Sequence, residues 1–233
     1  MRILLWTIVG LFLLAAFAMT LMVSPQEIST RLQQIAVEKQ DASATVHIIF
    51  FVVLVFGIAI RRIREPLFAA FIAFVSMSAA IVAITHRLTP NIIVFVLYVI
   101  LIGRAYLRRK LNFSFMDLPI ADRFFGVVAL IFGFWYLHWV GPPVALSALL
   151  YSPVGILNCP TMLTVSGFLI LTSPPRSRGL EAFVGISTLY FGLFGIIRLG
   201  AWVDIALVAC SLFMILRLVL PSGREQVTEP TAA

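Results

Sequence analysis

The sequence predicts an all-α fold, a polytopic bundle of about eight transmembrane helices with both termini in the cytoplasm. Hydrophobic residues make up 61% of the 233 residues and charged residues only 12%, and the mean hydropathy is +1.07. A soluble domain needs more charged residues than this to cover its surface. A membrane barrel would show short alternating strands, and that pattern is missing from the sequence. The apolar runs instead have the length that a helix needs to cross a bilayer.

Eight apolar segments approach the required length, because a hydrocarbon core about 30 Å thick takes roughly 20 helical residues. In chain order they are residues 3–23, 43–60, 67–85, 91–107, 122–140, 156–173, 182–198 and 202–219. The connections between them are short, which predicts neighbouring antiparallel helices in one bundle. We therefore expect a single transmembrane domain over residues 1–220. The polar residues 221–233, which include proline, predict a disordered cytoplasmic tail.

The first segment also resembles a signal peptide. Met1-Arg2 precedes an apolar run, and Ala16-Phe17-Ala18 has the small residues of a cleavage site. The apolar run continues through Val23, which is longer than a usual signal core. This length favours a retained helical anchor, and cleavage stays open as the alternative.

The loop that follows, residues 24–42, predicts a short amphipathic helix. Ser24 and Glu27 have the spacing of a capping box, and Pro25 falls at the first helical position. The apolar side chains then fall on one helical face: Ile28, Leu32 and Ile35. We expect this helix to lie on the outer membrane surface.

The orientation follows from the distribution of lysine and arginine. Thirteen of the 17 basic residues fall on the side that holds both termini: Arg2, Arg61, Arg62, Arg64, Arg104, Arg108, Arg109, Lys110, Arg123, Arg176, Arg178, Arg217 and Arg224. The other side has Arg31, Lys39, Arg87 and Arg198. The richer side is expected to be cytoplasmic. Because these residues are scattered between apolar spans, the net charge of +7 does not indicate a nucleic-acid partner. The expected partner is the lipid bilayer.

The sixth predicted span is interrupted at its outer end. Ser152-Pro153 and Asn158-Cys159-Pro160 both break the apolar pattern. Proline is favoured in the first helical turn, so a helix should begin near Pro160, with Asn158 or Cys159 as its cap. Too few apolar residues then remain before Ser173 for a full crossing.

Irregular backbone at membrane depth is tolerated where it is buried in protein or lines a wet cavity. The sequence therefore predicts an outward-facing polar pocket formed by Asn158, Cys159 and Thr161. The alternative is an ordinary span in which Cys159 packs as a small apolar residue.

Four further polar residues fall in the outer half of the predicted spans and are candidates for the same pocket: His47, His86, His138 and Asp204. Imidazole and thiolate suit zinc or copper, which makes Cys159 and His138 candidate metal ligands. No H-x-x-H, C-x-x-C or E-x-x-H spacing supports a metal, and two cysteines form no disulfide framework. The sequence favours an interfacial polar residue for each histidine taken alone, and an ion pair to Arg198 across a turn for Asp204. The sequence identifies no cofactor.

The run CPTMLTVSGFLIL, residues 159–171, resembles a family of uncharacterised bacterial multi-pass membrane proteins classed as a domain of unknown function. The recurring feature of that family is Cys-Pro-Thr-Thr followed by Phe-Thr-Phe-Gly and a leucine-rich span. Cys159, Pro160, Thr161 and Gly167 match, whereas Met162 replaces the second threonine. The similarity covers roughly residues 105–215. It implies an eight-span protein of the bacterial inner membrane and implies no activity.

These observations favour a small permease or a protein that handles a solute or metal ion in an outward-facing pocket. A structural or assembly subunit of a larger membrane complex, or of a homo-oligomer, is the alternative. A membrane-embedded thiol enzyme is a further alternative, for which the sequence offers no second cysteine nearby. The residues favour a role without catalysis, and we assign no catalytic residue.

Overall fold

The structure is a computed structural model that describes residues 23–115, 117–136 and 148–220, together with isolated positions among the first 22 residues. The helices are α2 (Pro25–Glu38), α3 (Gln40–Ala59), α4 (Arg61–Thr85), α5 (Thr89–Leu107), α6 (Ile120–Phe134), α7 (Ala148–Tyr151), α8 (Asn158–Ile170), α9 (Arg178–Leu199) and α10 (Ile205–Val219). A 3-10 turn, η2 (Trp202–Asp204), precedes α10, and two short strands are β1 (Asn112–Phe113) and β2 (Thr172–Ser173). The predicted all-α class is confirmed for this part of the chain.

Five of the described helices are long and apolar enough to cross a membrane: α3, α4, α5, α9 and α10 together with η2. This number supports a multi-pass membrane protein. Most of the predicted first span and the tail at 221–233 lie outside the described residues. The predicted fifth and sixth spans correspond to α6, with 15 residues, and α8, with 13 residues. The count of eight spans and the location of the termini therefore stay predictions.

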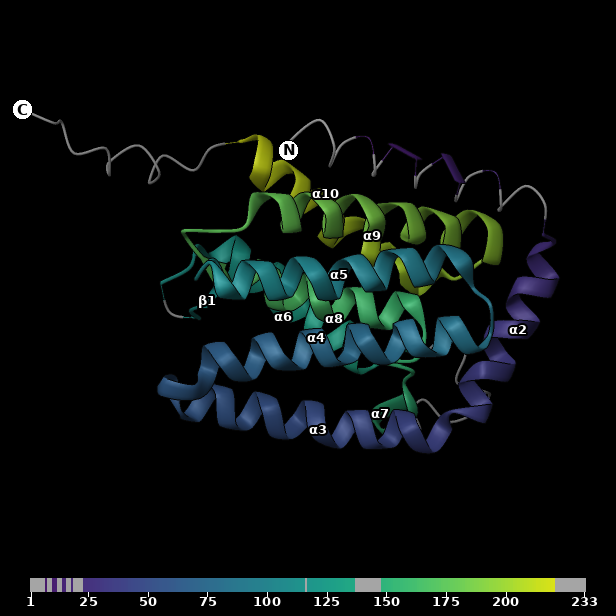
Figure 1. The fold of residues 1–233 in the computed structure, drawn as a ribbon, viewed down its shortest axis with the longest axis horizontal. Coiled ribbons are helices and arrows are strands. Elements are labelled where there is room, and N and C mark those ends of the chain that lie inside the picture. Colours follow the sequence, from purple (N-terminus) through teal and green to yellow (C-terminus); the bar gives the residue numbers. More distant parts are fainter. Residues whose placement is uncertain are drawn as a thin grey trace, which may run out of the picture.

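The long helices run side by side, and α8 lies among them (Figure 1). All 13 residues of α8 are buried, and the helix packs against α4, α6, α9 and α10. A helix that is buried on every side is surrounded by protein and not by lipid. A short central helix of this kind does not need the length of a bilayer span.

Glycines allow α6 and α8 to approach closely. A Cβ atom at Gly133 of α6 would lie 2.5 Å from Oγ1 of Thr164, and one at Gly167 of α8 would lie 2.8 Å from the side chain of Leu130. Small residues at helix interfaces permit such contacts in membranes, where van der Waals packing drives association. This contact fixes α8 against α6.

Helix α2 crosses one end of the bundle (Figure 1). Its N-cap, Ser24, accepts a hydrogen bond from the backbone N of Glu27 at 3.2 Å. The apolar face of α2, formed by Leu32, Ile35 and Ala36, packs in one buried cluster with Val82, Ile156 and Leu157. The face that we expected to rest on lipid is thus covered by the ends of other elements of the protein.

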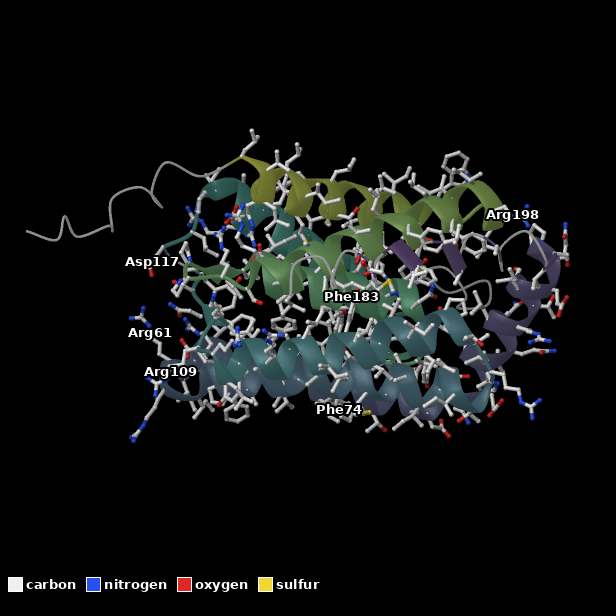
Figure 2. The ribbon with its side chains drawn as sticks, turned by 45° about the horizontal axis from the view of Figure 1, so that its top comes forward. Arg61, Phe74, Arg109, Asp117, Phe183 and Arg198 are labelled. Atoms are coloured by element: carbon white, nitrogen blue, oxygen red, sulfur yellow. The ribbon has the colours of Figure 1, made fainter. Side chains whose placement is uncertain are left out.

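The opposite end of the molecule carries the basic connections. Figure 2 shows Arg61 and Arg109 there together with Asp117, whereas Arg198 lies at the end near α2. At this basic end β1 pairs with β2 in antiparallel register, with Asn112 opposite Ser173. The amino end of α8 therefore faces α2, and its carboxyl end is continued by β2 at the basic end.

Candidate functional site

The chain is interrupted immediately before α8. Helix α7 ends at Tyr151, and α8 begins at Asn158 after a buried segment of turns. Gly155 has a φ of +72° in this segment, a conformation that glycine adopts without strain. The break is where the sequence predicts it, but the helix begins two residues before Pro160 and its N-cap is Leu157. Neither Asn158 nor Cys159 is the cap.

Hydrogen bonds hold the interrupting segment in place. The hydroxyl of Ser152 accepts from the backbone N of Tyr136 at 3.1 Å and donates to the carbonyl of Gly133 at 3.2 Å. Oγ1 of Thr161 accepts from the backbone N of Gly155 at 2.8 Å and donates to the carbonyl of Leu157. Thr161 therefore stabilises the turn before α8 and is not among the residues that line the cavity described next.

A cavity of about 260 Å³ lies between α2, the start of α5, the amino end of α8 and the last turns of α9. Exposed Arg31, Arg87 and Thr89 are among its lining residues, so it reaches the surface of the protein. Its walls are mostly apolar and include Ile28, Leu32, Leu88, Phe191, Phe194 and Leu199. Most ligand pockets in proteins have this composition, apolar walls with a few polar groups.

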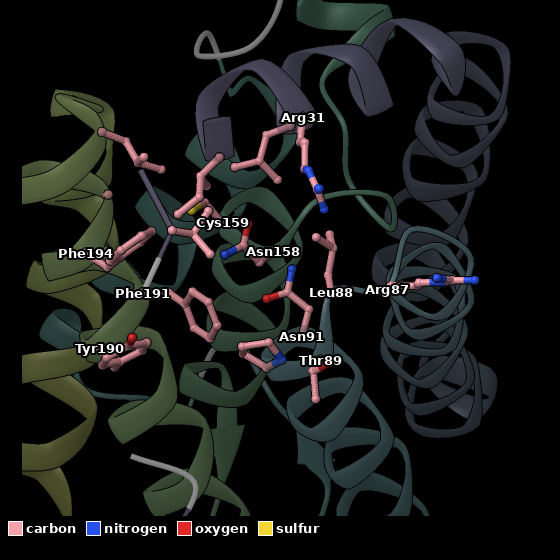
Figure 3. A pocket seen from close by; sticks show the side chains of 16 residues that line it. Arg31, Arg87, Leu88, Thr89, Asn91, Asn158, Cys159, Tyr190, Phe191 and Phe194 are labelled. Carbon is pink, nitrogen blue, oxygen red and sulfur yellow. The ribbon is translucent and has the colours of Figure 1, made fainter. Parts of the chain in front are cut away.

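Two asparagines supply the buried polar groups of this cavity. Asn91 is 9% exposed and Asn158 is 7% exposed, and both side chains lie in the cavity (Figure 3). Neither side-chain amide forms a hydrogen bond with any residue that the structure describes. An amide carries two donors and an acceptor, and the atoms of these two amides are not among the fully buried polar atoms, so they are accessible from the cavity. These two amides are available to a molecule inside the cavity.

Cys159 lies between the cavity and a buried carboxylate. It is among the lining residues and is 4% exposed. Its Sγ donates to Oδ2 of Asp204 at 3.4 Å, and the hydroxyl of Tyr136 donates to Oδ1 of the same carboxylate at 2.5 Å. Asp204 is fully buried at the N-cap of α10, and its side chain makes no capping bond to the helix.

The predicted ion pair between Arg198 and Asp204 does not form. Arg198 instead donates from Nη2 to the carbonyl of Val23 at 3.3 Å, while the carboxylate accepts from Tyr136 and Cys159. The turn between α9 and α10 is closed by Gly200 in the left-handed conformation, so it does not depend on an ion pair.

The histidines are not brought to the cavity where the structure describes them. His47 contacts the carbonyl oxygens of Ser43, at 3.0 Å, and of Phe134, at 2.7 Å, through its two ring nitrogens. Nε2 of His86 lies 3.8 Å from Oε2 of Glu38, whose pKa is lowered by a hydrogen bond from Lys39. His138 lies outside the described residues.

No group of three or more histidine, cysteine or acidic side chains suited to a metal occurs within residues 23–115, 117–136 and 148–220. Of the predicted pocket residues, the structure brings together Asn158, Cys159 and Asp204, with Thr161 beside them in the turn. The candidate metal role of Cys159 with His138 stays a prediction.

A second buried polar cluster lies at the carboxyl end of α8, and sequence reasoning missed it. Nη1 of Arg217 lies 3.1 Å from Oδ2 of Asp122, and its Nη2 lies 2.8 Å from Oε1 of Glu181. Arg176 contacts the same Asp122 oxygen at 2.9 Å. Arg217 also donates to the carbonyl of Ile170 at 2.7 Å, and so holds the end of α8.

The sequence contains a signal for this cluster. Asp122 and Glu181 are acidic residues at the starts of apolar segments, at the same end as the arginines. Charged residues inside a bundle pair with one another. We had used Arg176 and Arg217 only as indicators of orientation.

No family model, curated protein or solved structure matches this chain. The similarity to the family with the Cys-Pro-Thr-Thr run therefore stays a prediction. The long apolar helices support a multi-pass membrane protein, and a more specific function has to be argued from the cavity itself.

Proposed function

We propose that this protein binds a small, neutral, amphipathic molecule in the cavity beneath α2, as a small permease or solute-handling protein of the bacterial inner membrane. The observation that carries the proposal is the pair of buried amides, Asn91 and Asn158, that have no partner among the described residues. In most small-molecule sites, a few polar groups among apolar walls orient the ligand, and the two amides provide such groups here.

The chemistry of the cavity favours a neutral ligand. Each amide can donate to a carbonyl or hydroxyl oxygen and accept from a hydroxyl or amide group. The aromatic rings of Phe191 and Phe194 and the aliphatic walls suit an apolar body. Arg31 at the rim is 55% exposed and pairs with Glu27 at 3.1 Å, so it offers little to an ion inside the cavity.

The distribution of charge supports a cavity that opens away from the cytoplasm. Arg31 and Arg87 line the cavity, and both belong to the end that is poor in basic residues. The basic connections, at the opposite end, would then be cytoplasmic. This orientation places both termini in the cytoplasm if eight spans are present.

The two alternatives have less support. A structural subunit would leave the buried amides of Asn91 and Asn158 without a role. A thiol enzyme needs Cys159 as a thiolate, whereas this thiol keeps its proton and donates a hydrogen bond to the Asp204 carboxylate.

The test uses Cys159 as a reporter of the cavity. The Cys210→Ala protein, with Cys159 as its single cysteine, is reconstituted in lipid nanodiscs and alkylated with N-ethylmaleimide. Octanamide, a neutral primary amide with an apolar chain, is the probe ligand, and octanoate is its charged counterpart. We expect octanamide to slow alkylation of Cys159 and octanoate to have little effect.

Two variants identify the groups that bind the probe. Asn91→Leu and Asn158→Leu should each raise the octanamide concentration needed for protection about five-fold or more, because each removes a hydrogen bond. Asn112→Ala, at an exposed residue of strand β1 at the other end, should leave protection unchanged. Alkylation that octanamide does not slow, or protection that survives both leucine variants, would overturn the proposal.

A further inference from the structure

Three carboxylates are buried in the described part of the protein, and one of them differs from the other two. Asp122 and Glu181 each lie within 3.1 Å of an arginine nitrogen. Asp204 is the most buried of the three, at 0% exposed. Within the described ranges it forms no ion pair with a lysine, arginine or histidine.

Every described group that faces Asp204 is neutral. The hydroxyl of Tyr136, which follows α6, and the thiol of Cys159 in α8 donate to its two oxygens. Helix α9 presents Gly195, whose missing side chain leaves room for the carboxylate. Arg198 of the same helix donates to the carbonyl of Val23. His138 follows Tyr136 by two residues and lies outside the described residues, so the experiment below includes it.

An ionised carboxylate in this place is costly. Its desolvation in the apolar interior costs several kcal/mol, and two hydrogen bonds from neutral donors recover only part of that cost. Uptake of a proton removes the charge and with it most of the penalty. Buried acidic residues without a counter-ion are accordingly the usual sites of proton binding in membrane proteins.

The position of Cys159 connects this carboxylate to the cavity. The same side chain lines the cavity and donates to Asp204. A molecule that fills the cavity contacts Cys159 and so alters the surroundings of Asp204. Linkage of this kind is reciprocal, because a ligand that changes proton affinity must itself bind with an affinity that depends on protonation.

We propose that Asp204 is a proton-binding site whose occupancy is linked through Cys159 to that of the cavity. One proton from the aqueous phase adds to the carboxylate, the side chain becomes a neutral carboxylic acid, and no electron is transferred. Proton binding at Asp204 does not depend on the proposed function, whereas the linkage rests on it.

Infrared difference spectroscopy during a pH titration tests the proton site. We expect the protein in nanodiscs to show the C=O stretching band of a buried protonated carboxyl group. The band should be lost in Asp204→Asn and retained in Asp117→Asn, which changes an exposed carboxylate that bonds to Ser114. A His138→Gln variant should also retain it, and a band that disappears in that variant would contradict the assignment.

Tyr136→Phe keeps the test decisive if Asp204→Asn does not fold. The tyrosine hydroxyl donates to the carboxylate and so favours the ionised form. Its removal should move the midpoint of the band to higher pH. A spectrum with no band sensitive to Asp204→Asn, or a midpoint that Tyr136→Phe leaves in place, would overturn the proton site.

Octanamide protection of Cys159 at different pH values tests the linkage. The octanamide concentration needed for protection should change with pH, and the midpoint of this change should equal that of the infrared band. The change with pH should be absent in Asp204→Asn. An infrared band with protection that is independent of pH would overturn the linkage but not the proton site. A band with no octanamide protection at all would overturn both the proposed function and the linkage, and would leave the proton site supported.

Discussion

The thiol of Cys159 donates a hydrogen bond to the Asp204 carboxylate, with Sγ 3.4 Å from Oδ2 and 45 residues of chain between them. This contact joins the amino end of α8 to the start of α10. Because Cys159 also lines the cavity, a buried acidic group lies one side chain away from the space that we propose to be the binding site. The predictions below test the contacts that create this arrangement.

Gly195→Ala should disturb the surroundings of Asp204. A Cβ atom at this position would overlap the carboxylate oxygen. Overpacking of a buried site costs about 1–3 kcal/mol, so we expect a lower midpoint of thermal unfolding in detergent. Gly103→Ala in α5 is the matched control, since nothing lies within 4 Å of its added Cβ. Equal stability of the two variants would show that Asp204 is not held against α9.

Arg217→Met should destabilise the protein far more than a comparable change at the surface. The arginine side chain is 7% exposed and neutralises Asp122 and Glu181. Removal of one partner from a buried ion pair costs about 3–5 kcal/mol. Arg31→Met breaks the exposed pair with Glu27 and should cost at most about 1 kcal/mol. Unfolding midpoints of the two variants that coincide would be inconsistent with a structural role for the buried cluster.

Asn91→Leu and Asn158→Leu should leave stability unchanged or raise it, while they weaken octanamide binding. Each substitution removes a buried amide that has no partner among the described residues. Tyr98→Phe is the contrasting case, because the tyrosine hydroxyl lies 2.8 Å from Oγ of Ser187. Loss of that bond should cost about 1 kcal/mol. Asparagine variants that lose as much stability as Tyr98→Phe would indicate that the amides are bonded within the protein.

Thr161→Val should loosen the turn that precedes α8. The substitution keeps the shape of the side chain but removes the bonds to the backbone of Gly155 and Leu157. An unsatisfied buried N–H costs about 1–3 kcal/mol. Hydrogen exchange at the amide of Gly155 should become faster in this variant. Thr45→Val, at an exposed site in α3, should leave that exchange rate unchanged.

The sequence predicts the helical membrane class and the broken segment before α8 with some accuracy. Composition alone excludes a soluble domain, and Pro153 and Pro160 mark the break because proline disfavours a continuous helix. The start of α8 was misplaced by two residues because any residue can provide the extended backbone of an N-cap, as Leu157 does.

Lateral neighbours could not be predicted, because a single sequence gives the depth of a residue in the membrane and not its position in the bundle. The sequence predicted Arg198 as the partner of Asp204, but Arg198 contacts the carbonyl of Val23 instead. His47 was predicted at the same membrane depth as the pocket residues, but its ring contacts the carbonyl of Phe134 and not the cavity. Asn91 was read as part of an apolar span, although an amide near the end of a span was a usable signal.

The reactivity of Cys159 toward a small, membrane-impermeant methanethiosulfonate reagent in sealed vesicles tests the central claim most directly. That claim is that the amino end of α8 opens into a cavity on the α2 side, and we propose that this side is extracytoplasmic. The Cys210→Ala protein should react at Cys159 when the reagent is added outside, and the Cys159→Ala protein should not react, because Cys210 is fully buried. A Cys159 thiol that stays unmodified from the outside, or that reacts only from the cytoplasmic face, would contradict the account.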